Sequence, residues 1–391
     1  MNTLKFGNGE WYGKKDTILA YNDENSNFKP LPFSFDRASS ATVINKDGLI
    51  ETVGSGEPRI DFSNDAKGAL LLEPTRSNLV TYSEAFDNAA WIKVGGAITP
   101  NIGVSPDGSL NADRFYISTA AANTRLYINY TYSASTYTAS VYAKNNGNTN
   151  TFRFSYADSG GQSFSPNFTL TNQWQRFEYT FTSVGGSGVF WFACVTSSTG
   201  VGSELDIQIF GAQLEQGSYA TSYIPTQGSA VTRVADVCNN GGNEQVINST
   251  EGTLYVEANL IDGYDNNNWL GIIYDSSNAN NRIYIQRYLG NIQSGIRVNG
   301  VIQSEITQSS SSLGKNKIAF TYKLNEFKMF VNGSQVGVTD TIGSVFSADT
   351  LDKLNVGVYH NDTLNFNNVI NDFRLYNTAL TDAELQALTS N

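Results

Sequence analysis

The sequence is poor in the residue types that many metal and acid–base centres use. It has one histidine, His360, and two cysteines, Cys194 and Cys238, among 391 residues. A single histidine excludes a histidine-based metal centre, and two cysteines allow at most one disulfide. Cys194 lies in the apolar run VFWFACV. We predict that it is a buried, unreactive thiol.

Basic residues and long apolar runs are also scarce. The chain has 25 basic and 36 acidic residues, a formal charge of −11, and no basic cluster. An acidic surface repels phosphate backbones, so we predict no nucleic-acid partner. The start, MNTLKFGNGEW, has no signal-peptide pattern, and no apolar run reaches membrane length. We therefore expect synthesis in a reducing cytosol and no membrane insertion.

Catalytic motifs are missing as well. The sequence has neither a Gly-x-Ser-x-Gly elbow nor a Gly-x-x-x-x-Gly-Lys-Ser/Thr phosphate loop. Glu204 and Asp206 resemble the start of the Glu-x-Asp-x-x-Glu strand of laminarinase-type glycoside hydrolases. The second glutamate of that motif is missing here, because Gln208 and Ile209 follow Ile207. A glutamine cannot protonate a leaving group. We predict that the chain is not an enzyme.

Aromatic residues and glycine are abundant. The chain has 21 Tyr, 22 Phe and 35 Gly, whereas only 16% of its residues are charged. Aromatics separated by Gly, Asn and Ser turns are typical of short strands rather than long helices. The fold class we predict is all-β: two tandem antiparallel β-sandwiches, preceded by a small β-containing N-terminal segment.

The pattern divides the chain into four segments. Residues 1–77 form a docking segment with a hairpin around Asn45-Lys46-Asp47-Gly48, and its short strands are expected to need a neighbouring domain or another subunit. Residues 78–226 form a jelly roll with strands such as TYTASVYAK, QRFEYTFTS and GVFWFACVT. Residues 227–250 form a linker, and residues 251–391 form the second sandwich, with strands such as RIYIQRYLG and IQSGIRVNG.

Local signals mark turns, one helix and an extended strap. Val-Asn-Gly at 298–300 and 331–333 predicts two hairpin turns, because Asn and Gly both tolerate positive φ. Thr381 followed by Glu384 predicts a capping box that starts a helix over TDAELQAL. Residues 218–226 leave the jelly roll as a strap that Tyr219 and Tyr223 hold against the domain, or as an ordinary linker.

Two segments resemble known binding domains. NKIAFTYKLNEFKMFVNGSQVG and VINDFRLYNTALTDAELQAL resemble laminin-G or concanavalin A-like lectin domains over residues 251–391. NLVTYSEAFDNAAWIKV, TYTASVYAK and WQRFEYTFTS are similar to jelly-roll carbohydrate-binding modules. The resemblance implies that loops at one edge of the C-terminal sandwich carry a ligand or calcium.

A wider resemblance covers the junctions between the segments. FDRASSATVINKDGLIETV, PRIDF, GALLLEPTRSNLVTYSEAF and GAQLEQGSYATSYIPT resemble tailed-bacteriophage virion proteins of the tail-fibre or head-fibre type. The resemblance implies a structural protein assembled in the host cytoplasm and displayed on the virion surface, where it adheres to glycans. Its N-terminal segment would bind other virion proteins, and its copies would form a homo-oligomer such as a trimer.

Two other functions stay open beside adhesion. One is a capsid or tail decoration protein that binds no glycan. The other is a polysaccharide depolymerase, which requires a pair of carboxylates in one cleft.

Sugar sites combine an aromatic face with a few polar groups, and several loops and strands offer that mixture. In the jelly roll, alternation places Trp191 on the face opposite Phe190 and Phe192. There it would line a concave surface beside Tyr156, with burial of both side chains as the alternative. Trp269 has the alternative of pointing into the core. The carbohydrate-binding candidates are Tyr264, Trp269, Tyr359, His360, Asn361, Trp191 and Tyr156.

Calcium is the one cofactor that the acidic loops suggest. It takes several oxygen ligands, and the candidate ligands are Asp262, Asp265 and Asp362. No Asp-x-Asp-x-Asp-Gly loop supports such a site.

Overall fold

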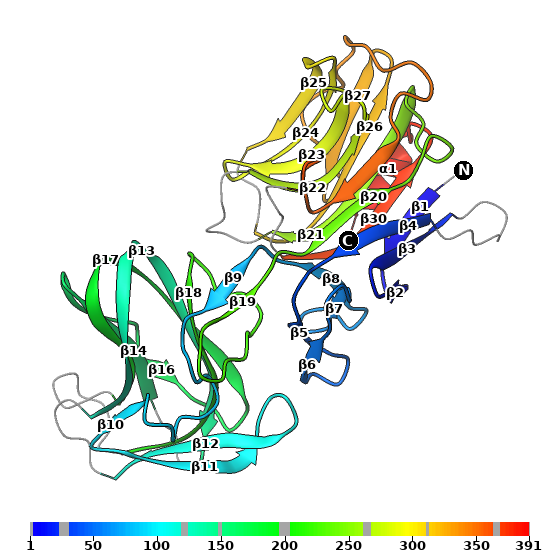
Figure 1. The fold of residues 1–391 in the computed structure, drawn as a ribbon. Helices are drawn as coiled ribbons and strands as arrows, with labels where there is room; N and C mark the ends of the chain where they lie inside the picture. Colours follow the sequence, from blue (N-terminus) through cyan, green and yellow to red (C-terminus); the bar gives the residue numbers. More distant parts are fainter. Residues whose placement is uncertain are drawn as a thin grey trace. The chain divides into compact units, whose positions relative to one another are not determined.

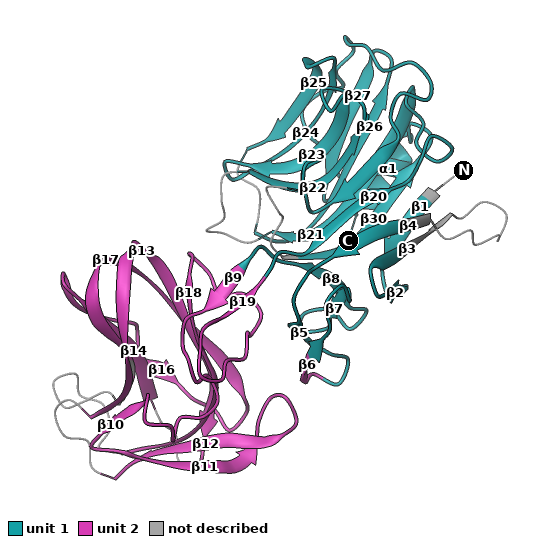
Figure 2. Cartoon of the chain, viewed as in Figure 1, with its two compact units in different colours: residues 1–47, 52–75, 234–391 teal, residues 48–51, 76–233 magenta. Residues whose placement is uncertain are grey.

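The chain folds almost entirely into β-strands, which confirms the predicted fold class (Figure 1). A computed structural model describes residues 3–22, 31–118, 124–147, 151–194, 204–260, 267–309, 313–362 and 368–390. The chain forms two compact units (Figure 2): unit 1 comprises residues 1–47, 52–75 and 234–391, and unit 2 comprises residues 48–51 and 76–233. Within the described ranges, no helix is long and apolar enough to cross a membrane.

Unit 2 is a β-sandwich with an aromatic core. Its strands are β9 (Arg76–Asn78), β10 (Ile92–Val94), β11 (Ala97–Val104), β12 (Leu110–Ile117), β13 (Arg125–Asn145), β14 (Thr151–Asp158), β15 (Gly161–Phe164), β16 (Phe168–Thr169), β17 (Gln175–Cys194), β18 (Leu205–Gln216) and β19 (Val231–Arg233). The main sheet has the order β11-β12-β18-β13-β17-β14-β15. Trp91, Phe154 and Phe192 are among the buried residues of its core.

Two strands of unit 2 are longer than the sequence predicts. The predicted pairs RLYINYTYS with TYTASVYAK, and QRFEYTFTS with GVFWFACVT, each merge into one strand, β13 and β17. Gly185 and Gly186 have positive φ, yet the register runs on across them, from Ala134 opposite Val184 to Tyr132 opposite Gly186. The sequence VGGSG predicts a turn at this glycine pair, but in the structure the pair is an irregularity inside a continuous strand.

The predicted strap at residues 218–226 lies against unit 2. Tyr223 is buried, its hydroxyl donates to Glu84 Oε1 (2.9 Å), and its oxygen lies 2.6 Å from Ser83 Oγ. Tyr219 stacks under the Arg76 guanidinium, whose Cζ is 5.0 Å from the ring centroid. The two tyrosines are the anchors that the sequence predicted.

Unit 1 is a sandwich built from both ends of the chain. Its strands are β1 (Thr3–Gly7), β2 (Gly13–Lys14), β3 (Thr17–Asn22), β4 (Leu31–Asp36), β5 (Ala41–Ile44), β7 (Arg59–Asp61), β8 (Ala69–Leu72), β20 (Val237–Gly241), β21 (Glu251–Leu260), β22 (Asn267–Tyr274), β23 (Arg282–Tyr288), β24 (Asn291–Val298), β25 (Val301–Gln308), β26 (Gly314–Lys323), β27 (Glu326–Val331), β28 (Ser334–Gln335), β29 (Lys353–Val356) and β30 (Asn368–Tyr376).

These strands form two layers. One runs β30-β21-β26-β27-β28, with β1 and β8 paired along the free edge of β30. The other runs β25-β24-β23-β22-β29-β20-β4-β3. Phe33 of the second layer packs on Phe6 and Phe373 of the first, with centroids 5.3 and 6.4 Å apart. The main core lies between the layers.

The unit boundaries differ from the predicted segments. Residues 1–77 were expected to need a neighbour, and the neighbour is the C-terminal sandwich of the same chain: β1 pairs with β30, and β4 pairs with β20. The predicted linker 227–250 contains β19 and β20 and buries Cys238. Residues 1–77 therefore complete a sandwich rather than stand apart.

A buried ion network joins these distant stretches within unit 1. Asp236 accepts from Arg37 Nη1 (2.9 Å) and from Arg59 Nη2, while Arg59 Nη1 donates to Glu73 Oε2 (2.7 Å). All four side chains are at most 5% exposed. Burial lowers the pKa of Arg59, but Asp236 and Glu73 outweigh it and raise that pKa above its usual value. The network links the N-terminal stretches at β4, β7 and β8 to Asp236, which directly precedes β20.

The predicted turns and helix are confirmed. Asn299-Gly300 and Asn332-Gly333 have positive φ and join β24 to β25 and β27 to β28. β5 pairs with β6 (Ile50–Val53) as a two-stranded sheet. Helix α1 (Asp382–Thr389) starts at the predicted Thr381–Glu384 capping box.

Candidate functional site

A pocket of about 460 Å³ opens on one face of unit 1, and we call it the sheet-face pocket. Strands β22 to β25 supply all but one of its residues, and Tyr359 follows β29. Its lining residues are Asn267, Trp269, Arg282, Tyr284, Gln286, Tyr288, Gln293, Arg297, Glu305 and Tyr359.

Strand alternation explains why these side chains share a face. In β23, Ile283 and Ile285 enter the core, so the intervening residues point to the opposite face. The register then sets Trp269 opposite Gln286, and Gly295 opposite both Tyr284 and Glu305. A Cβ on Gly295 would lie 2.8 Å from Tyr284 Oη, so only glycine leaves the tyrosine its place.

Two aromatic rings form the apolar part of the pocket. Trp269 and Tyr359 have centroids 4.5 Å apart and planes inclined by 31°. Tyr284 meets Trp269 edge-on at 5.4 Å. The loop that carries Tyr359 is fixed because Asn355 Nδ2 donates to the Tyr359 carbonyl (3.1 Å). Such rings offer a flat apolar surface of the kind on which a sugar ring stacks.

Polar groups surround these rings. Tyr284 Oη donates to Glu305 Oε2 (2.5 Å), and Arg297 Nη2 lies 3.8 Å from the same oxygen. Burial and then Glu305 raise the pKa of Tyr284 above its usual value, so the phenol stays a donor. Gln286 Nε2 donates to Gln293 Oε1.

Several buried polar atoms of the lining residues have no hydrogen-bond partner among the described residues. They are Asn267 Oδ1, Trp269 Nε1, Arg282 Nε, Gln286 Oε1 and Arg297 Nε. Trp269 is only 5% exposed and Gln286 only 6%. Buried groups of this kind are rarely left unsatisfied, because each one costs about 1–3 kcal/mol. Five such atoms lie around one pocket, where a bound molecule would supply the missing hydrogen-bond partners.

The structure brings together only part of the predicted C-terminal site. Trp269 and Tyr359 line the pocket, so Trp269 is both buried and part of the site. His360 lies beside Tyr359, with centroids 4.0 Å apart, and Asn361 is exposed on the same loop. Tyr264 lies outside the described residues.

Sequence reasoning missed the strand residues of the site. Arg282, Tyr284, Gln286 and Arg297 belong to stretches that were recognised only as strands. Their signal was available in RIYIQRY, where arginine, tyrosine and glutamine alternate with isoleucine. A strand with one apolar face and one face of aromatic and polar side chains is a candidate for binding.

The jelly-roll candidates do not form the predicted pair. Tyr156 is the register partner of Phe190, a buried core residue, whereas Trp191 pairs with Ser155. Tyr156 stacks on Phe181 at 3.9 Å and donates to the Thr182 carbonyl (2.7 Å). Opposite residues of an antiparallel pair share a face, so Tyr156 packs towards the core side of β14. The side chain of Trp191 lies outside what the structure describes.

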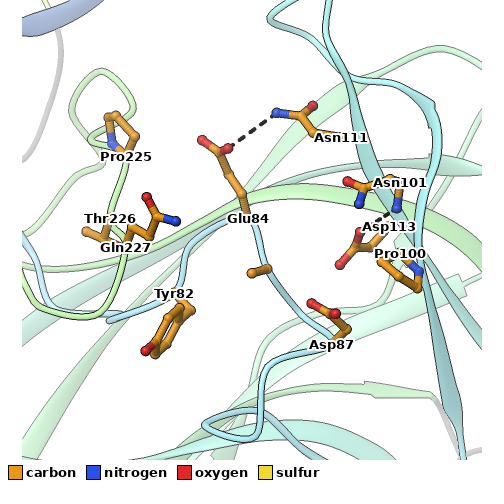
Figure 3. Close-up of a pocket in the computed structure, with 11 residues that line it drawn as sticks. Tyr82, Glu84, Asp87, Pro100, Asn101, Asn111, Asp113, Pro225, Thr226 and Gln227 are labelled. Carbon is orange, nitrogen blue, oxygen red and sulfur yellow. Dashed lines mark hydrogen bonds between the residues drawn. The ribbon is translucent and has the colours of Figure 1, made fainter.

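Unit 2 has its own pocket of about 460 Å³ beside the strap, which we call the strap pocket (Figure 3). Figure 3 shows Glu84 between Asn111 on one side and the end of the strap, with the following Gln227, on the other. Asn111 Nδ2 donates to Glu84 Oε2 (3.3 Å). Asp113 accepts from the backbone N–H groups of Phe86 (3.0 Å) and Asn101 (2.9 Å).

These carboxylates serve the local structure. Burial raises the pKa of both Glu84 and Asp113. Asp113 uses its two oxygens to hold the turn at Phe86 and strand β11 at Asn101, and Glu84 anchors the strap through Tyr223. The suspected motif residue Asp206 is bound by both nitrogens of one edge of Arg114, each at 2.7 Å.

The structure offers little for calcium. Asp362 is exposed and accepts from Asn239 Nδ2 (2.8 Å), whereas Asp262 and Asp265 lie outside the described residues. Within the described part of the chain, no three Asp, Glu, His or Cys side chains gather as metal ligands would.

His360 gives a direct probe of the loop that carries Tyr359. Burial and then the positive charge of Arg282 lower its pKa from 6.5, against an opposing effect of Asp362, and the rings of Tyr274 and Tyr359 flank it. The folded state therefore binds this proton more weakly than the unfolded chain. We expect stability to be lost as the pH falls from about 6.5 through the folded pKa.

The measurement is an NMR titration, which is unambiguous because the chain has one histidine. Its ring proton should titrate below pH 6.5. A midpoint at or above 6.5 would mean that His360 does not lie against Arg282.

Comparison with known proteins supports the fold of the C-terminal sandwich. Residues 242–386, less than half of the chain, match the model of the "Concanavalin A-like lectin/glucanases superfamily". This confirms the predicted resemblance of the C-terminal segment to lectin-like domains. No match to a curated protein was found.

Several solved structures are similar to parts of the chain. The CBM40 of a Ruminococcus gnavus IT-sialidase, bound to α2,3-sialyllactose, is 16% identical, with 39% of this chain and 94% of that chain covered and a TM-score of 0.34. Domain 4 of AbnA, a GH43 extracellular arabinanase from Geobacillus stearothermophilus in complex with arabinotriose, is 14% identical. The match covers 44% of this chain and 83% of that chain, with a TM-score of 0.31. The CBM22-1-CBM22-2 tandem domain of Paenibacillus barcinonensis Xyn10C is 10% identical. The match covers 78% of this chain and 98% of that chain, with a TM-score of 0.30. Over residues 242–386 the chain is therefore similar to concanavalin A-like lectin domains.

Proposed function

We propose that the chain is a glycan-binding adhesin whose sheet-face pocket holds the sugar. The observation that carries the proposal is the Trp269–Tyr359 ring pair beside buried donors and acceptors that lack partners among the described residues. The rings suit the apolar face of a sugar, and the free polar atoms suit its hydroxyl groups. The lectin-like family match over residues 242–386 supports the same function.

We further propose that the chain belongs to a tailed-bacteriophage particle. This part rests on the resemblance of FDRASSATVINKDGLIETV and its neighbouring stretches to fibre proteins. The chain would be assembled in the bacterial cytoplasm, bound to other virion proteins near its N-terminal strands, and displayed at the virion surface. A homotrimer would raise the avidity of weak sites, because linked sites bind a surface together.

The experiment that tests adhesion is a glycan array probed with the full chain, followed by titration of the best ligand in solution. Saturable binding that competing free sugar abolishes would support the adhesin. An array without any binding would favour the decoration protein. Release of reducing ends from a bound polysaccharide would favour the depolymerase, with the strap pocket as the first place to look.

A further inference from the structure

We propose that the sheet-face pocket selects acidic glycans and that Arg282 holds a sugar carboxylate in it. The inference rests on the proposed glycan-binding function and adds the class of glycan.

The charges of the lining residues do not balance. Glu305 lies 3.8 Å from Arg297 and accepts a hydrogen bond from Tyr284, so the negative charge of this carboxylate is already compensated. Arg282 is half-buried and forms no ion pair with any described residue. A partly desolvated guanidinium without a counter-charge is unfavourable, and the chain as a whole carries a charge of −11. The surplus positive charge of the pocket therefore sits at Arg282.

The guanidinium of Arg282 is held in place. Its Nη1 donates to the Ala279 carbonyl (2.9 Å), and its Cζ lies 5.9 Å from the centroid of the Tyr359 ring. Its Nε has no partner among the described residues. One edge is thus fixed to the backbone, while the edge formed by Nε and Nη2 donates to no described residue.

That edge has the geometry of a carboxylate receptor. Two parallel N–H groups bind the two oxygens of a carboxylate at once, which makes such bonds stronger and more directional than those between neutral groups. Because the side chain is already fixed, little conformational entropy is lost on binding. Tyr359 stacks beside the same guanidinium, so one sugar ring can meet the aromatic face and present its carboxylate to Arg282.

The test uses acidic polysaccharides and their matched neutral forms. The full chain is titrated with oligomers of polygalacturonate, alginate, hyaluronate and polysialic acid, each also in its carboxyl-reduced form, and with dextran sulfate. We expect at least one acidic oligomer to bind about ten- to hundredfold more tightly than its carboxyl-reduced form. The difference should shrink in high salt.

Arg282 variants assign the preference to one side chain. Arg282→Gln should reduce the acidic-to-neutral affinity ratio to about one while the carboxyl-reduced form still binds, which shows that the fold is intact. Arg282→Lys should keep only part of the ratio, because lysine lacks the paired N–H groups. Lys14→Gln removes the same charge from an exposed residue outside the pocket and should leave the ratio unchanged.

The outcomes separate this inference from the proposed function. If neutral and acidic forms bind equally, or if Arg282→Gln keeps the ratio, the acidic preference is wrong and glycan binding stands. If dextran sulfate binds more tightly than every carboxylated oligomer, the carboxylate assignment is wrong. If neither these probes nor a broad array contains a ligand, the proposed function itself fails.

Discussion

Replacement of Asp236 by asparagine is expected to lower the free energy of unfolding of unit 1 by about 3–5 kcal/mol. Asp236 is 1% exposed, and its two oxygens contact Arg37 and Arg59 separately. In Asp236→Asn, the buried guanidinium groups of Arg37 and Arg59 would both lose the negative charge that they now contact. A buried charge without compensation is costly because the interior solvates it poorly.

The measurement combines denaturant unfolding with hydrogen exchange followed by mass spectrometry. Exchange should accelerate in β4, β7, β8 and β20, which the network connects, and should stay unchanged in β13 of unit 2. Glu244→Gln is the matched control, since Glu244 is exposed and its replacement should cost less than about 0.5 kcal/mol. A loss below about 1 kcal/mol for Asp236→Asn would mean that the network does not hold the N-terminal strands.

Replacement of Tyr359 by alanine is expected to weaken glycan binding about thirtyfold, which corresponds to about 2 kcal/mol. Tyr359 is the lining aromatic that comes from a loop rather than from strands β22 to β25, and it contacts Trp269, His360 and Arg282. Its removal takes away one of the two stacked rings and also the surface that positions the guanidinium. Acidic and neutral sugars should both bind more weakly.

The affinity is measured by calorimetric titration of the ligand that the array selects. Tyr12→Ala is the control, because Tyr12 is 49% exposed in unit 1 and does not line the pocket. Both variants should unfold at the temperature of the parent chain to within a few degrees. Equal affinities of Tyr359→Ala and the parent would show that the sugar does not stack at this ring.

The fold was accessible from local patterns in the sequence. Elements that depend on only a few neighbouring residues were predicted correctly. They are the strands RIYIQRY and IQSGIRV, the Val-Asn-Gly turns and the Thr381–Glu384 capping box. The strap was predictable for the same reason, because Tyr219 and Tyr223 follow a finished strand.

The pairing of strands that lie far apart in the sequence could not be predicted from local patterns. The ladder of β1 with β30 joins residues at opposite ends of the chain, and the bond between Arg37 and Asp236 spans 199 positions. A lone Arg in FDRAS or a lone Asp in RVADV carries no local sign of a buried partner. The segment boundaries therefore differed, and the strands β19 and β20 were missed inside the predicted linker.

The candidate site was likewise predictable only where local sequence was enough. Trp269 and Tyr359, which line the sheet-face pocket, were candidates because aromatic residues in polar loops are typical of sugar sites. Arg282 and Gln286 were missed because their role depends on which face of the sheet is covered, and that depends on the opposite layer. Tyr156 was misplaced beside Trp191 because alternation within one strand does not fix the register with the next.

The most direct measurement is a crystal structure of the full chain soaked with the tightest acidic oligosaccharide. We predict a sugar ring against Tyr359, with its carboxylate bonded to the Nε and Nη2 edge of Arg282. Density for the sugar in the strap pocket of unit 2, with the sheet-face pocket empty, would contradict this account.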